Sequence, residues 1–130
     1  MLSSSRNTKT RIAALLRLPL LTTAVVQKGA IVVMKAGEAQ GGHAAASLLY
    51  VGVAVDGADG PKGDSDILVR RDEAARFDND AVAPITHSDI GTKAAILDDH
   101  TVSSDATGRS QTGLIIDVDA DGVWIMVEGA

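Results

Sequence analysis

The amino-acid sequence predicts an all-β fold: a compact single-domain sandwich or barrel with an extended basic N-terminal arm and at most one short helical turn. Short β-rich segments recur about every ten to fifteen residues, and each ends at Gly, Asp, Asn or Pro. The 130 residues have the length of one domain, and with only 2% aromatic residues the core must consist of Val, Ile, Leu and Ala. We expect the arm over residues 1–21 and the β-domain over residues 22–130.

The first half of the domain contains a pair of predicted strands whose connection has two alternatives, and one strand with a clear apolar pattern. Thr22–Gln27 and Ala30–Met34 are β-branched segments separated by Lys28-Gly29, which predicts a hairpin or a bulged corner. Leu48–Val55 is apolar almost throughout and predicts a central strand, in which Gly52 marks a bulge or a close backbone approach.

Turn residues organise the middle of the chain. Asp56–Ser65 holds three glycines and a proline among acidic residues, which predicts a mobile loop without any element. Asp66–Arg71 alternates in hydrophobicity and predicts a strand, which a second short strand at Ala74–Phe77 continues. Thr86–Gly91 resembles one helical turn, with Gly91 suited to a left-handed exit.

The C-terminal third predicts short strands at Lys93–Leu97 and Thr101–Ser103, followed by a hairpin of Gly113–Val118 and Val123–Val127. In the last strand Val123, Ile125 and Val127 share one face, and Trp124 and Met126 share the other. Trp124 and Met126 are therefore candidate oligomer-contact residues, and the alternative is a strand covered on both faces within one domain.

Charge divides the chain into two parts of opposite sign. Residues 1–37 contain six basic residues and no Asp or Glu, whereas residues 38–130 contain six basic and seventeen acidic residues, a net charge of −11. This asymmetry predicts a contact arm that binds an acidic protein surface, because the arm lacks stacking aromatics and the body would repel nucleic-acid and membrane phosphates. The alternative is a frayed, solvated terminus.

Several kinds of chemistry are excluded or disfavoured. The absence of Cys excludes disulfides, thiolate metal sites and a cysteine nucleophile. Arg17 and Pro19 interrupt the longest apolar run, which argues against a membrane span and against a cleaved presequence. The three histidines are far apart in the sequence and we expect them to be exposed. We therefore expect no catalytic residue, no cofactor and no metal ligand set.

One motif matches a calcium loop by spacing alone. Asp117, Asp119, Asp121 and Gly122, with Glu128 at the twelfth position, satisfy the EF-hand pattern. An EF-hand needs a helix on each side, but the residues before this motif are strand formers. The motif therefore predicts a strand-to-strand turn, and we expect no calcium dependence of folding.

Three stretches together resemble a known family: Lys28–Val33 (KGAIVV), Ile67–Arg71 (ILVRR), and Leu97–Val102 followed by Gly113 and Val118–Trp124 (VDADGVW). Their order and spacing are similar to those of the capsid cement, or head decoration, proteins of tailed bacteriophages. The resemblance spans about residues 22–127 and implies a β-tulip-like domain without enzymatic activity. The resemblance does not extend to Ile12–Leu21, for which the two alternatives are a capsid-binding arm and an extra strand.

The resemblance implies a location on the outer capsid surface of a virion, after synthesis in the host cytoplasm, with the major capsid protein as partner. It also implies self-association, for which a trimer is the common solution. On this interpretation the candidate capsid-contact residues are Arg6, Lys9, Arg11 and Arg17. The competing hypothesis is a small bacterial β-barrel that binds a ligand or a partner protein, although three aromatic residues make a poor ligand pocket.

Overall fold

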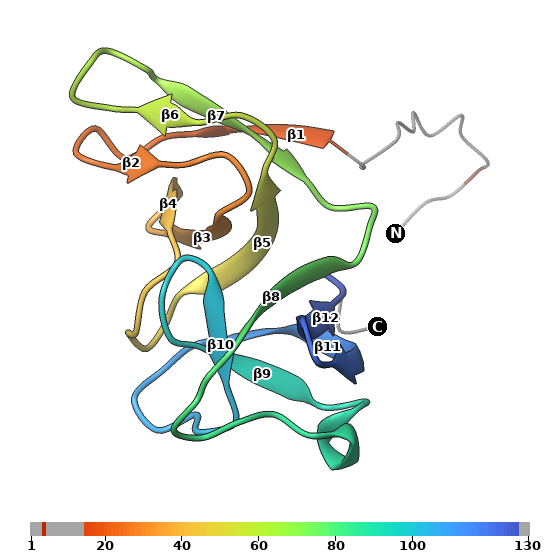
Figure 1. Ribbon diagram of the computed structural model, residues 1–130. Helices are drawn as coiled ribbons and strands as arrows, with labels where there is room; N and C mark the ends of the chain where they lie inside the picture. Colours follow the sequence, from red (N-terminus) through yellow and green to blue (C-terminus); the bar gives the residue numbers. More distant parts are fainter. Residues whose placement is uncertain (1–3, 5–14, 128–130) are drawn as a thin grey trace.

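The structure, a computed structural model, describes residue 4 and residues 15–127 (Figure 1). Its twelve strands, with one short helical turn in the described residues, confirm the predicted all-β class. The elements are β1 (Leu15–Pro19), β2 (Val25–Val26), β3 (Ile31–Lys35), β4 (Glu38–Gly41), β5 (Leu49–Ala54), β6 (Ala58–Asp59), β7 (Asp66–Arg70), β8 (Ala75–Asn79), the 3-10 turn η1 (His87–Asp89), β9 (Lys93–Ile96), β10 (Thr101–Ser103), β11 (Gln111–Asp119) and β12 (Gly122–Ile125).

The first half of the chain forms an antiparallel sheet with strand order β1-β7-β5-β3-β4. The two outer strands of this sheet approach each other at one end, where Leu20 forms a parallel bridge with Ala39. The Leu21 N–H also donates to the Ala39 carbonyl at 2.9 Å. The sheet therefore curls toward closure, with the β2–β6 ribbon beside it (Figure 1).

The second half of the chain closes into a barrel with strand order β10-β8-β12-β11-β9. The β8–β10 pair is parallel and the other barrel pairs are antiparallel. Figure 1 shows this barrel below the five-stranded sheet. Closure leaves none of these five strands with a free edge, because each is paired on both sides.

The buried side chains form two clusters that share β3 as a common wall. Ile31 and Val33 pack in one cluster with barrel residues such as Ile125. Val32, between them, packs in the other cluster with Val69. Since successive residues of a strand point to opposite faces, a strand buried on both sides must be apolar at every position. This explains the uninterrupted apolar run of β3 and joins both halves into one domain.

The predicted central strand is confirmed as β5, which lies between β7 and β3. Gly52 has a φ of +139°, and the β3–β5 register shifts opposite it. A Cβ atom at this position would lie 2.4 Å from the Arg70 carbonyl oxygen. Both roles proposed for this glycine, a bulge and a close backbone approach, are therefore present.

The predicted hairpin between Thr22–Gln27 and Ala30–Met34 is wrong, and its alternative, a corner, is correct. The Ala30 N–H donates to the Gln27 carbonyl at 3.1 Å, and the chain turns from β2 into a different sheet. β2 pairs with β6, whereas β3 pairs with β4 through a tight turn at Ala36-Gly37, where both residues have positive φ.

The prediction that Asp56–Ser65 contains no element is also wrong, because β6 lies within it. The pairing of β6 with β2 depends on close backbone contacts that its glycines allow. A Cβ atom on Gly60 would lie 2.5 Å from the Thr22 carbonyl oxygen. Gly60, one of the glycines that suggested a loop, is thus the residue that lets the chain pack closely beside this ribbon.

For the second half of Ile12–Leu21 the structure decides between the two alternatives, an arm and an extra strand. Leu15–Pro19 form β1, which pairs antiparallel with β7, and Leu20 is buried. This part of the expected extension is an extra strand, and the sheet begins before residue 22. The expected arm over residues 1–14 lies outside the described residues, apart from Ser4.

Candidate functional site

The outer surface of β12 carries the two residues predicted as oligomer contacts. Val123 and Ile125 are fully buried in the barrel and Val127 is nearly so, which confirms their shared inward face. Trp124 and Met126 lie on the opposite face, where Trp124 is half-buried and Met126 is 39% exposed. An exposed methionine beside a tryptophan is a typical component of a protein contact surface.

Trp124 is held in place by polar contacts on the barrel surface. Its indole Nε1–H donates to Asp119 Oδ2 at 2.9 Å, and the Arg76 guanidinium lies 5.9 Å from the ring centroid. This hydrogen bond, followed by the backbone N–H of Asp121, holds the pKa of Asp119 below its usual range. These contacts within the chain therefore hold the indole in one orientation without a partner protein.

The calcium-loop motif forms a hairpin turn between β11 and β12, as predicted, and strands rather than helices flank it. Asp119 Oδ1 accepts the backbone N–H groups of Asp121 at 2.8 Å and Gly122 at 3.0 Å. Asp117 Oδ1 accepts the N–H of Val118 at 2.9 Å. These carboxylates close the turn and position the indole. Glu128 lies outside the described residues.

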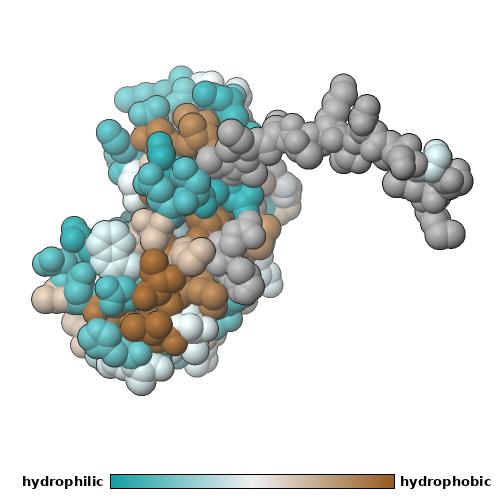
Figure 2. Space-filling view, turned by 90° about the vertical axis from the view of Figure 1, so that its right-hand side faces the viewer, coloured by the Kyte–Doolittle hydropathy of each residue, from teal (hydrophilic) through white to brown (hydrophobic). Residues whose placement is uncertain are grey.

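Two further exposed apolar residues extend this surface. The β11–β12 register shifts between Ile115 and Asp117, and the bulge leaves Ile116 43% exposed. Ile90, 41% exposed, precedes Gly91, whose N–H donates to the Ile115 carbonyl at 2.9 Å. Figure 2 shows hydrophobic residues gathered on the barrel part of the molecule. We call the set Ile90, Ile116, Trp124 and Met126 the barrel face.

Two of the four residues of the barrel face were predicted from the sequence. Trp124 and Met126 follow from strand alternation, but the bulge that exposes Ile116 has no sequence signal in the apolar run Leu114–Ile116. Ile90 belongs to the predicted helical turn, and only the hydrogen bond from Gly91 to Ile115 shows that this turn packs against β11.

The structure describes one of the four predicted capsid-contact residues. Arg17 lies exposed on β1, and its guanidinium forms an ion pair with Asp66 Oδ1 at 2.9 Å. Arg6, Lys9 and Arg11 lie outside the described residues. An exposed pair of this kind contributes little to stability, so the Arg17 side chain can be recruited by an acidic partner at small cost.

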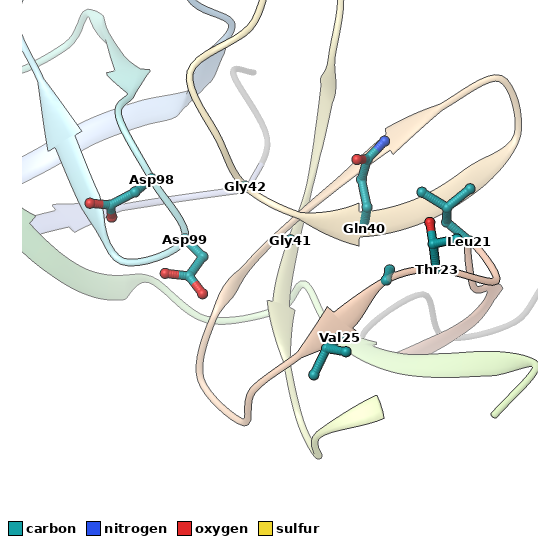
Figure 3. Close-up of a pocket in the computed structure, with 9 residues that line it drawn as sticks. Leu21, Thr23, Val25, Gln40, Gly41, Gly42, Asp98 and Asp99 are labelled. Atoms are coloured by element: carbon teal, nitrogen blue, oxygen red, sulfur yellow. The ribbon is translucent and has the colours of Figure 1, made fainter. Parts of the chain in front are cut away.

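A second candidate surface surrounds the turn between β9 and β10. A cavity of about 380 Å³ is lined by Asp98 and Asp99 of this turn and by Gln40, Gly41 and Gly42 on the β4 side (Figure 3). The Asp99 carbonyl accepts the Ile31 N–H at 2.8 Å, which ties this barrel turn to β3. The turn therefore connects the barrel to the five-stranded sheet through a backbone hydrogen bond.

His100 joins the two aspartates in a compact cluster. Its Nδ1 lies 2.9 Å from Asp99 Oδ1 and 3.2 Å from Asp98 Oδ1, and its Nε2 lies 4.0 Å from Asp78 Oδ2. The hydrogen bond to Asp99, and then the charges of the acids, raise the pKa of His100. The sequence prediction that the three histidines are exposed is confirmed, but the approach of Asp78 from β8 was missed.

Replacing His100 with asparagine is expected to lower thermal stability in a pH-dependent way. The raised pKa means that folding favours the protonated imidazole, so its stabilisation is complete below about pH 6.5, the pKa of an unperturbed histidine, and is lost as the pH rises through the raised value. Melting temperatures of wild type and His100→Asn should differ most below about pH 6.5 and converge as the pH rises above the raised pKa of His100. His87→Asn is the control, and a difference independent of pH would contradict this assignment.

The described residues contain no helix long and apolar enough to cross a membrane. Comparison with protein-family models, with curated proteins and with solved structures finds no match to this chain.

Proposed function

We propose that this chain is a structural protein that binds the outside of a phage capsid and reinforces contacts between major capsid subunits, without catalysing a reaction. The barrel face carries this proposal: Ile90, Ile116 and Met126 are exposed on the outside of the closed barrel, and the indole of Trp124 is held there by Asp119 and Arg76. Exposed apolar groups of this kind mark sites of protein contact, and a preformed surface loses little conformational entropy on binding.

The distribution of charge supports an acidic protein as the partner of the N-terminal segment. The net charge of −11 on residues 38–130 opposes binding to phosphate-rich surfaces, whereas the basic residues before residue 38 complement an acidic groove. On a capsid each such contact is repeated by symmetry. Weak individual contacts therefore sum to stable attachment if copies also touch one another through the barrel face.

The resemblance to cement proteins suggests the major capsid protein as the partner. Co-expression of the two proteins tests this proposal. The chain is produced with the major capsid protein of the same genome, and shells are separated on a density gradient. Co-sedimentation at a fixed ratio to the capsid protein is the expected result. A chain that stays at the top of the gradient would contradict the proposal and would favour the alternative, a small binding module.

Two variants locate the contact within the same assay. Met126→Asp places a charge on the barrel face and is expected to weaken attachment about tenfold, equivalent to about 1.4 kcal/mol. Val82→Asp is the matched control, because Val82 is exposed outside the barrel face. Deletion of residues 1–11 should lower occupancy while the fold persists, since the sheet begins at Leu15. Undiminished occupancy in both variants would discard these contact surfaces.

A further inference from the structure

Three consecutive residues of the β9–β10 turn, Asp98, Asp99 and His100, bring together side chains of the kind that bind metal ions. Each offers one ligand atom, and these atoms all lie within 4.8 Å of one another. From the sequence no metal ligand set is expected, because the three histidines are far apart. In this turn, however, one histidine adjoins two carboxylates, and the barrel face does not include it.

The separations of the donor atoms suit a single metal ion. His100 Nδ1 lies 2.9 Å from Asp99 Oδ1 and 3.2 Å from Asp98 Oδ1. Zinc binds imidazole nitrogen and carboxylate oxygen at about 2.0–2.2 Å, so neighbouring ligand atoms in octahedral or tetrahedral coordination are about 2.8–3.6 Å apart. The three donors therefore need little movement to share one ion.

Backbone hydrogen bonds hold this turn in shape. Asp98 Oδ1 accepts the N–H groups of His100 at 2.9 Å and of Thr101 at 2.7 Å. The Asp99 carbonyl accepts the Ile31 N–H at 2.8 Å, which fixes the turn from the side of the sheet. A site whose ligands are already positioned loses little conformational entropy when it binds an ion.

Asp78, on β8, places a third carboxylate near the other ring nitrogen. Its Oδ2 lies 4.0 Å from His100 Nε2, and its N–H donates to the His100 carbonyl at 2.8 Å. Both side chains are exposed, so a small rotation of either closes the first distance to a hydrogen bond. A histidine that binds a metal usually donates its second ring N–H to a carboxylate, which sets the orientation of the ring. Asp78 supplies this partner from a different strand.

The charge and the openness of the cluster both favour a bound cation. The described ion pairs of Asp78, Asp98 and Asp99 are all with His100. A protonated imidazole balances one of these three negative charges, whereas a divalent ion on a neutral imidazole balances two. Asp98 and Asp99 line the cavity of about 380 Å³, and Asp99 and His100 line another of about 270 Å³. Water can therefore reach the ion and complete its coordination.

We propose that Asp98, Asp99 and His100 bind one divalent transition-metal ion, with Asp78 orienting the imidazole. Zinc is the ion that suits this set best, because its sites combine imidazole nitrogen with carboxylate oxygen. The site does not depend on the proposed capsid contact. An ion that binds the folded chain and not the unfolded chain raises its stability.

Calorimetric titration with zinc chloride, after EDTA has stripped the chain and been removed, tests this site. We expect one ion per chain and a rise in melting temperature that EDTA reverses. His100→Asn and Asp99→Asn should each weaken zinc binding about tenfold or more. His87→Asn is the matched control, because His87 is also exposed and has an acidic neighbour, Asp89. Zinc and a proton compete for His100 Nδ1, so the pH series with His100→Asn is carried out in EDTA.

Nitrogen-15 NMR of the imidazoles gives a second measurement, which needs no variant to fold. Zinc should shift the Nδ1 resonance of His100 in the wild-type chain and leave those of His43 and His87 in place. Magnesium chloride at equal ionic strength is the control for an acidic patch, because magnesium prefers oxygen ligands. Equal binding of magnesium, no saturable zinc binding below about 1 mM, or a zinc affinity unchanged by His100→Asn would each overturn the proposal.

Discussion

Replacing Gly113 with alanine is expected to destabilise the barrel more than any single deletion of a core methyl group. A Cβ atom on Gly113 would lie 2.6 Å from the Val127 carbonyl oxygen and closer still to that of Met126. Both obstacles are backbone atoms of the chain leaving β12, so no side-chain rotation relieves the clash. Overpacking usually costs about 1–3 kcal/mol, and we expect this backbone clash to exceed about 3 kcal/mol.

Urea denaturation followed by fluorescence measures this effect, because Trp124 is the only tryptophan and lies on β12. Gly41→Ala is the matched control. Gly41 is also a strand glycine, but the nearest atom to its added Cβ is Asp99 Cβ at 3.9 Å, an ordinary contact. We expect Gly41→Ala to change the free energy of unfolding by less than about 1 kcal/mol. Equal stability of the two variants would show that β11 and the end of β12 do not pack as described.

Replacing Ile125 with alanine is expected to cost about 2–5 kcal/mol of unfolding free energy, because it removes three carbons from a fully buried position and leaves a cavity. Ile125 faces the barrel interior and packs in the same cluster as Ile31 of β3 and Phe77 of β8. The loss should therefore lower the stability of both halves of the fold in one transition.

Ile116→Ala provides the comparison for Ile125→Ala. Ile116 lies nine residues earlier on the paired strand β11, but it is exposed at the bulge, and the same truncation there should change stability by about 0.5 kcal/mol or less. The two variants differ only in the face of the barrel that they alter. A similar loss of stability in both would mean that Ile116, like Ile125, belongs to the core.

Local patterning predicted the elements in which one face is buried. β7 alternates, with Ile67 and Val69 inside, and β12 alternates with Val123 and Ile125 inside, as expected from the two-residue period of a strand. β5 was predicted as central from its apolar composition, and the η1 turn from its capping residues and Gly91. In each case the signal lies within a few consecutive residues.

Features that depend on distant contacts could not be predicted in this way. β2 and β6 have two residues each, and only their pairing across the chain makes them strands. The approach of Asp78 to His100 depends on the parallel pairing of β8 with β10. The cavity beside Asp98 and Asp99 likewise combines the β9–β10 turn with the β4 side. No local pattern specifies which strands meet across a closed barrel.

Imaging of capsid shells assembled with and without this chain tests the proposed decoration role most directly. The account predicts added density on the outer surface of the shells, in a constant number of copies per capsid subunit, with the barrel face buried against a neighbouring copy or against the capsid. Shells with identical outer surfaces in both preparations, while the chain remains soluble and folded beside them, would contradict it.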